Sequence, residues 1–332
     1  MTADPSVDGV LVQWGERLFY PRNRIVKANP TPRLDTLMRR KAAVIRKRIQ
    51  ALAVRRAPEV MVKVAGGGRG MRAIAAELSY ITRNGELALE DDRGVRSIGK
   101  EALRDHVDQW RYGGSLIEEV SERREAINVT LSMPAGTEPE RVLQAARAFA
   151  RAELAGNRYV LVLHKDRAHP HVHLIVRAQA RSGERINVWA QRQRWREIFA
   201  AQLRHLGVDA EATSQSCRGE NRSAWPSWRR QAREMGSVPT EAAPKKSGDR
   251  YQTNRASAMR AWSHIITALS RSTDATDRQL AGHVAAFIRD TPFVEENLGP
   301  RRGPRTPDAP TRNDRSVDLV AQRSRSRPDI ER

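Results

Sequence analysis

The chain has 332 residues, with 59 Lys or Arg against 39 Asp or Glu, so its formal net charge is +20. The single cysteine, Cys217, excludes a disulfide framework or a thiolate zinc site within one chain, and no segment reaches the roughly 20 apolar residues of a membrane span. The charge favours nucleic acid as a partner, because Lys and Arg displace counterions from phosphates, while a solubilising basic surface or a ribosomal or membrane-surface role stays open.

The N-terminal part of the chain predicts a helix followed by a strand and a second helix. Residues 35–56 are basic and have helix-forming composition. Residues 60–64 predict a β-strand, and the glycine-rich run 66–70 leads into a helix over residues 71–81, which has an apolar rhythm of about 3.6 residues. The glycine run matches neither the P-loop nor the dinucleotide fingerprint, so nucleotide binding is not expected.

Further helices and strands are expected along the rest of the chain. They are, in chain order, a charged connection over residues 86–99, a helix over 100–110, a strand over 126–133, a helix over 138–154, strands over 158–163 and 171–177, and helices over 195–206, 251–269 and 277–288. The two strands on either side of the short loop near residue 167 are expected to be antiparallel neighbours. The fold class predicted is α/β (α+β), with a mainly antiparallel central sheet flanked by helices.

Composition divides the chain into five segments. They are a basic helical N-terminal extension (residues 1–55), a central domain (56–235), a linker (236–250), a short helical region (251–290) and a disordered Arg-rich tail (291–332). The first nine residues lack the basic and then apolar run of a signal peptide, which predicts a cytoplasmic protein without membrane insertion. Cys217 is interpreted as a bystander.

The strongest chemical signal is the segment 164–173, which holds four of the eight histidines. Alternate side chains of a strand share a face, so His171 and His173 project together, and His164 arrives from the neighbouring strand. Three such imidazoles can hold a divalent cation and leave positions open for phosphate oxygen and water. Asp166 is expected on that face, where it would orient an imidazole or accept a proton. The alternatives are adventitious metal binding by a surface cluster, or structural histidines.

A metal site of this kind would also suit a hydrolase that uses metal-bound water, so the position of the tyrosines matters. Among the five tyrosines, Tyr80 is the best placed, because it follows the first strand and helix of the central domain. Its phenol could attack phosphorus if a metal neutralised the phosphate and a base assisted the loss of its proton. The alternative is that Tyr80 is only an amphipathic core residue.

These residues resemble the relaxases of conjugative and mobilisable elements, a family of HUH endonucleases that includes the T-DNA border endonucleases. The resemblance covers about residues 58–219. It is carried by the strand, glycine run and helix that end in Tyr80-Ile81, by the S-x-P-A-G-T stretch within residues 129–137, and by the pattern H-x-D-x-x-H-P-H-V-H at residues 164–173. The central domain would then be a relaxase/mobilisation nuclease domain.

Carried over position by position, the resemblance assigns roles to five residues. It implies Tyr80 as the nucleophile, Asp166 as the orienting or proton-accepting residue, and His164, His171 and His173 as the ligands of Mg²⁺ or Mn²⁺. By ligand preference alone, an all-imidazole site would bind Zn²⁺, Ni²⁺ or Co²⁺ at least as well. The sequence departs from the family at Arg177, where relatives often have Asn; Arg177 could instead contact phosphate.

The resemblance also implies an activity and partners. The activity is a site- and strand-specific nick at an origin of transfer, made by transesterification through a 5′-phosphotyrosyl intermediate, which starts conjugative transfer. The partners are single-stranded DNA at the nick, relaxosome accessory proteins and a type IV secretion coupling protein; Trp189 or Trp195 could contact the DNA. The alternatives are a rolling-circle replication initiator or transposase built on the same site, and a non-catalytic DNA-binding accessory protein.

Overall fold

The computed structural model describes residues 6–20, 34–166, 168–220 and 248–294. The predicted linker therefore falls largely outside the described residues, and so does the predicted tail from residue 295 onward. The helices are α1 (Val7–Phe19), α2 (Thr36–Ala53), α3 (Met71–Ile81), α4 (Lys100–Tyr112), α5 (Pro139–Glu153), α6 (Val188–His205), α8 (Asp249–Ser270) and α9 (Ala275–Arg289). Among the described residues, no helix combines the length and the hydropathy that crossing a membrane requires.

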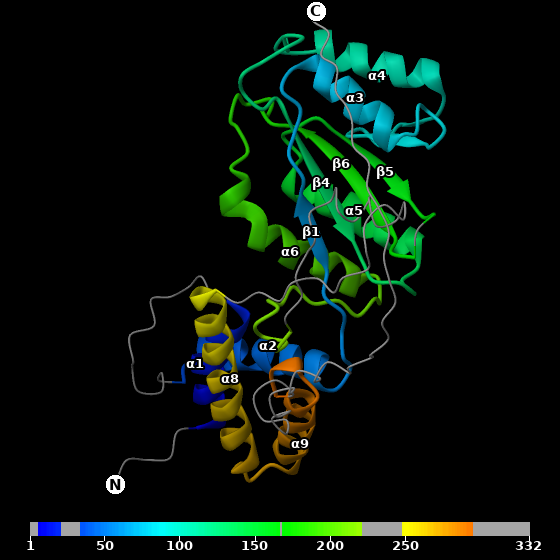
Figure 1. Ribbon diagram of the computed structural model, residues 1–332. Helices are drawn as coiled ribbons and strands as arrows, with labels where there is room; N and C mark the ends of the chain where they lie inside the picture. Colours follow the sequence, from blue (N-terminus) through cyan, green and yellow to red (C-terminus); the bar gives the residue numbers. More distant parts are fainter. Residues whose placement is uncertain (1–5, 21–33, 167, 221–247, 295–332) are drawn as a thin grey trace, which may run out of the picture. The chain divides into compact units, whose positions relative to one another are not determined.

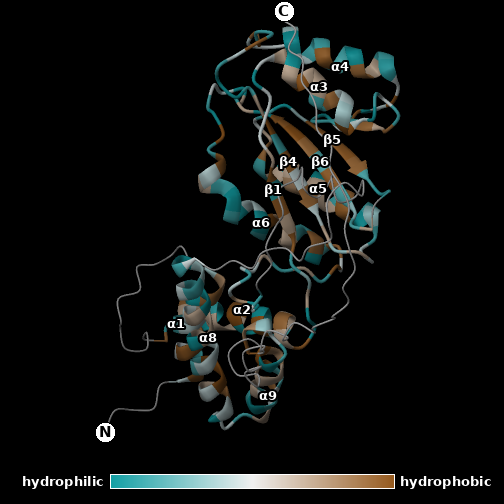
Figure 2. Ribbon diagram, viewed as in Figure 1, coloured by the Kyte–Doolittle hydropathy of each residue, from teal (hydrophilic) through white to brown (hydrophobic). Residues whose placement is uncertain are grey.

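Six strands form one antiparallel sheet, which confirms the predicted fold class (Figure 1). The strands are β1 (Met61–Val64), β2 (Leu89–Asp91), β3 (Arg96–Ser97), β4 (Ala126–Ser132), β5 (Tyr159–His164) and β6 (His171–Arg177). Their order across the sheet is β1-β4-β6-β5-β2-β3, so β5 and β6 are neighbours as expected and β1 is an edge strand. Figure 2 shows that the central strands are largely hydrophobic, as strands covered on both faces must be.

Helices cover both faces of the sheet, and the two-residue period of the strands decides which side chains meet which helices. Val172, Leu174 and Val176 of β6 are buried in one core with residues of α5 and α6. Ile175 of the same strand is buried in a second core with residues of α3 and α4. His171 and His173 are in phase with Ile175, so they lie on the face that α3 and α4 partly cover.

The structure corrects three expectations about element boundaries. The segment interpreted as a charged connection contains β2 and β3, whose turn is closed by backbone N–H groups of Arg93 and Val95 donating to the Asp91 carboxylate. Strands of three and two residues are too short to show a sequence period. Residues 7–19 form helix α1, a separate helix within the extension that was predicted to be helical, and α6 begins at Val188, where the Asn187 side chain accepts from the N–H of Ala190.

Helices from both ends of the described chain pack together around one hydrophobic core. Leu11 of α1, Ile45 of α2, Trp262 of α8 and Phe287 of α9 are all buried in it. Arg46 of α2 adds an ion pair with Asp277 of α9 across 231 positions of sequence. We call α1, α2, α8 and α9 the terminal helices.

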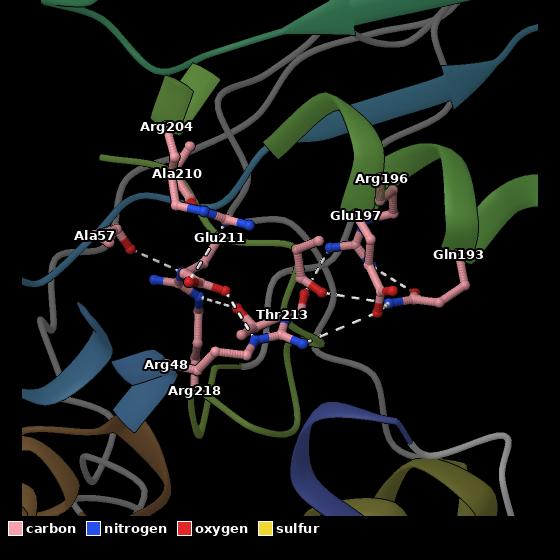
Figure 3. Close-up of polar contacts among 11 residues, drawn as sticks. Arg48, Ala57, Gln193, Arg196, Glu197, Arg204, Ala210, Glu211, Thr213 and Arg218 are labelled. Atoms are coloured by element: carbon pink, nitrogen blue, oxygen red, sulfur yellow. Dashed lines mark hydrogen bonds and ion pairs between the residues drawn. The ribbon is translucent and has the colours of Figure 1, made fainter. Parts of the chain in front are cut away.

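A polar cluster joins helix α2 to the end of the central domain (Figure 3). Glu211, which is 2% exposed, accepts a hydrogen bond from Arg48 Nε of α2 at 3.1 Å, and its other oxygen lies 3.5 Å from Arg204 Nη1 of α6. Burial is the largest single influence and lowers the pKa of Arg48, but Glu211, Tyr20 and Glu197 together outweigh it and raise the pKa of the guanidinium. Beside this pair, Arg218 donates to the carbonyl oxygen of Ala57 at 2.8 Å. Buried charges of this kind depend on each other, because each loses its hydration in the folded chain.

Candidate active site

Three histidines converge at one end of the sheet. His164, the last residue of β5, pairs in register with His171, the first residue of β6, and His173 follows on the same face. Their ring centroids are 4.5 to 5.1 Å apart, and one nitrogen of each ring lies within 4.8 Å of the others. The structure therefore brings together the three residues that the sequence singled out as ligands.

The hydrogen bonds of the cluster fit a metal site. His164 Nε2 lies 2.7 Å from the carbonyl oxygen of Ile81, and His171 Nδ1 lies 3.0 Å from that of His169. A carbonyl oxygen only accepts, so these ring nitrogens donate, and the opposite nitrogen of each neutral ring keeps a lone pair. Metal-binding histidines are usually oriented in this way by a backbone or carboxylate acceptor. Burial lowers the pKa of His164, which favours the neutral, ligating form.

Tyr80 lies next to this cluster, at the C-terminal end of α3. Helix α3 packs on the sheet through the buried residues Ile74, Leu78 and Ile81, whereas Tyr80 is 65% exposed. The carbonyl group of Ile81, which follows Tyr80 directly, is the acceptor for His164. Tyr80 is therefore not a core residue, and its phenol is accessible at the end of the helix nearest the histidines.

Asp166 pairs with an arginine. Its carboxylate forms an ion pair with Arg83, with an Oδ2 to Nη2 distance of 2.5 Å, and this hydrogen bond lowers the pKa of Asp166. Arg83 follows α3 in the left-handed region, with φ of 52°. The pair thus ties the chain after β5 to the end of the helix that carries Tyr80.

Two charged residues at this face, one on strand β1 and one on the covering helix α3, were not singled out in the sequence. Lys63 of β1 pairs in register with Thr130 of β4, which pairs with His173. Glu77 of α3 is half-buried, and burial raises its pKa although a hydrogen bond with Asn128 opposes the shift. Only the strand register and the helix docking bring these residues to the face that carries the histidines, so no local sequence signal could have identified them.

The structure contradicts two expected DNA contacts. Arg177 is buried, and its Nη2 donates to Ser115 Oγ at 2.7 Å and to the Ser115 carbonyl oxygen, so it fixes the loop after α4 and does not face a phosphate. Trp195 is 1% exposed and packs edge-on against Phe149, because α6 turns this face toward the sheet. Trp189 is 74% exposed, with the Arg192 guanidinium 5.3 Å from its ring centroid.

The glycine run before α3 serves packing. A Cβ at residue 67 would lie 1.9 Å from the carbonyl oxygen of Ala126, so the loop approaches β4 too closely for a side chain. The N–H groups of Met71 and Arg72 at the start of α3 donate to the carbonyl oxygens of Glu118 and Glu119. These N–H groups are thus already occupied, which argues against a phosphate cradle at this helix terminus.

Comparison with known proteins points to one family. Residues 80–208 match the family described as relaxase, MobA/VirD2-like, nuclease domain, and this range contains Tyr80 and all three histidines. The T-DNA border endonuclease VirD2 of Rhizobium radiobacter is 28% identical over 189 residues, which are 48% of this chain and 43% of that protein. VirD2 of Rhizobium rhizogenes is 28% identical over 215 residues, 56% of this chain and 48% of that protein. The chain thus spans about half the length of the curated relatives it matches.

Proposed function

We propose that this chain, which belongs to the MobA/VirD2-like relaxase family, makes a site- and strand-specific nick at an origin of transfer, with Tyr80 as the nucleophile. The observation that supports this most is the convergence of His164, His171 and His173 within 4.8 Å, bonded through the Ile81 carbonyl to the end of the helix that carries Tyr80. The nick would start conjugative transfer of a plasmid-like element.

In this proposal the three imidazoles would hold Mg²⁺ or Mn²⁺, which would polarise the scissile phosphate as a Lewis acid, and the hydrogen bonds that His164 and His171 donate to carbonyl oxygens would stay intact. The Tyr80 hydroxyl gives its proton to a base, for which Asp166 is the candidate, and the tyrosine oxygen attacks phosphorus. The bond between phosphorus and the 3′-oxygen breaks, and that oxygen takes up a proton. One phosphoester is exchanged for another, so a 5′-phosphotyrosyl bond keeps the ester energy and the free 3′-hydroxyl can reverse the step.

The other groups of the site have supporting roles. Asp166, ionised and held by Arg83, would keep a negative charge near His164 and is proposed to orient that ring or accept a proton. The exposure of Tyr80 suits a nucleophile that must approach a strand from outside the protein. The net charge of +20 would attract the DNA. Relaxosome accessory proteins, a type IV secretion coupling protein and a cytoplasmic location are proposed with the function.

The test is covalent adduct formation by the full chain. Wild type, Tyr80→Phe and Tyr112→Phe are mixed with Mn²⁺ and supercoiled DNA from an element that carries its origin of transfer, and protein-linked strands are separated on denaturing gels. Tyr112 is the matched control, because it is 70% exposed and also ends a helix. We expect an adduct in wild type and Tyr112→Phe, and none in Tyr80→Phe or after chelation.

Other outcomes would assign a different function. Nicking that persists without an adduct in Tyr80→Phe would indicate metal-activated water as the nucleophile. Tight DNA binding without nicking in any variant would favour the non-catalytic accessory protein. An adduct that moves to another tyrosine would keep the chemistry and reject the assignment of Tyr80.

A further inference from the structure

The face that carries the histidines continues to the edge of the sheet. The strand registers form two rows across it: Lys63, Thr130 and His173 in one, and Met61, Ser132 and His171 in the other. The first member of each row belongs to the edge strand β1, and both Lys63 and Met61 are exposed. A strip thus runs from the edge of the sheet to the histidine cluster.

The ammonium group of Lys63 has no bonding partner among the described residues. Among the described residues it forms no ion pair or hydrogen bond, whereas most arginines named above are paired with carboxylates or carbonyl groups. Its neighbours along the strand, Val62 and Val64, point to the opposite face and pack on the core of α5 and α6. The alternation of β1 therefore fixes the side of the sheet on which the ammonium group lies.

We propose that Lys63 binds a backbone phosphate of the DNA strand next to the scissile one, so that the single strand crosses β1 before it reaches the histidines. The inference rests on the proposed function, because it takes the histidine cluster as the site of the scissile phosphate. Neighbouring strands lie about 4.8 Å apart, so the Cα atoms of Lys63 and His173, two strands apart, are separated by about 10 Å. A lysine side chain spans part of that interval with a point charge on a flexible stem.

The chemistry of the strip fits single-stranded DNA. Met61 offers an apolar side chain about 7 Å from Lys63 along the strand, which suits a sugar or an unstacked base beside a phosphate. Ile175 and Val162, the next residues on this face, are buried in the core formed with α3, so the proposed path follows the two rows beside it.

The first test measures how salt weakens binding of an oligonucleotide of about six nucleotides and mixed sequence, in the Tyr80→Phe background with Mn²⁺ present. Each phosphate contact on a single strand contributes about 0.7 to the slope of log affinity against log salt. We expect Lys63→Gln to lose one such contact. The ratio of wild-type to Lys63→Gln affinity should therefore decrease about 2.6-fold when the salt concentration is raised fourfold. Lys63→Arg should keep the wild-type slope. Lys47→Gln, an exposed lysine of α2, is the matched control.

The second test reports position and does not depend on charge. The only native thiol, Cys217, is fully buried, and burial raises its pKa to about 12, so an introduced cysteine would be the one reactive thiol. Lys63→Cys should form a disulfide with a single-stranded oligonucleotide that carries an activated thiol tether much faster than Lys47→Cys does. Equal rates, an unchanged salt slope in Lys63→Gln, or an equal loss in Lys47→Gln would each overturn the inference.

These tests separate the inference from the proposed function, because they use a variant that cannot form the tyrosine adduct. If Lys63→Gln loses a phosphate contact but the wild type forms no adduct, the inference that this face binds a DNA strand would stand and the proposed nicking activity would be rejected. An adduct in wild type together with a neutral Lys63→Gln would retain the relaxase chemistry and reject this strand path.

Discussion

Glu211→Gln should destabilise the chain strongly, because it removes the nearer of the two carboxylates that pair with the buried Arg48. The side chain of Arg48 is 12% exposed and that of Glu211 is 3% exposed, so neither charge is well hydrated. Removing one partner of a buried ion pair typically costs 3 to 5 kcal/mol. Gln keeps a hydrogen-bond acceptor, and Glu197 remains 4.0 Å from Arg48, so we expect the lower end, about 3 kcal/mol.

Thermal and urea unfolding of the purified chain measure this loss. At about 2 to 4 °C per kcal/mol for a domain of this size, the melting midpoint should fall by about 6 to 12 °C. Glu184→Gln, which changes an exposed carboxylate, should stay within about 0.5 kcal/mol of wild type. Adding Arg48→Met should restore part of the stability, because it removes the unpaired charge. A Glu211→Gln chain as stable as Glu184→Gln would refute the reasoning that the pair is buried and mutually dependent.

Three further outcomes follow from the structure. Calorimetric titration should find one Mn²⁺ site per chain and more than about tenfold weaker binding in His171→Ala, because one of three imidazoles is lost. Iodoacetamide should not alkylate Cys217 in the native chain at pH 8 and should do so after unfolding, since burial raises its pKa to about 12. Burial lowers the pKa of His106, so the unfolded chain binds a proton at this residue more readily than the folded chain does. The free energy of unfolding should therefore decrease as the pH is lowered through about 6.5, and this decrease should be smaller in His106→Gln.

The candidate site could be predicted from sequence to the extent that it is local. His171 and His173 share a face because a strand alternates, and His164 joins them because a short loop makes neighbours of the two strands. The spacing of the histidines in residues 164–173 is therefore enough to predict that the three imidazoles lie together. Tyr80 is different: its position relative to the histidines depends on how α3 docks on the sheet, and the sequence indicated it only by its place after the first strand and helix and by the family resemblance.

The remaining features depend on contacts between distant residues. Arg177 looked available for phosphate because its role is set by Ser115, 62 positions away, and Trp195 looked available for DNA because the buried side of α6 is defined by α5. The terminal helices are joined by contacts such as Arg46 with Asp277, 231 positions apart, and no periodicity in either segment marks the other as its partner. Helix amphipathicity predicts that a face is buried and leaves open what covers it.

The buried pair at Glu211 and the proposed strand path at Lys63 are physically connected. The backbone of Glu211 accepts from the N–H of Val60 at 3.0 Å and donates to the carbonyl oxygen of Pro58 at 2.9 Å, immediately before β1 begins. The edge strand that carries Lys63 is thus held on one side by β4 and at its start by the segment that binds Arg48. If Glu211→Gln loosens that segment, the Lys63 contribution to the salt slope should weaken while Mn²⁺ binding by the histidines, which β5 and β6 hold, stays at the wild-type level. Loss of both together would mean that the sheet responds as one unit and that β1 has no separate role in guiding DNA.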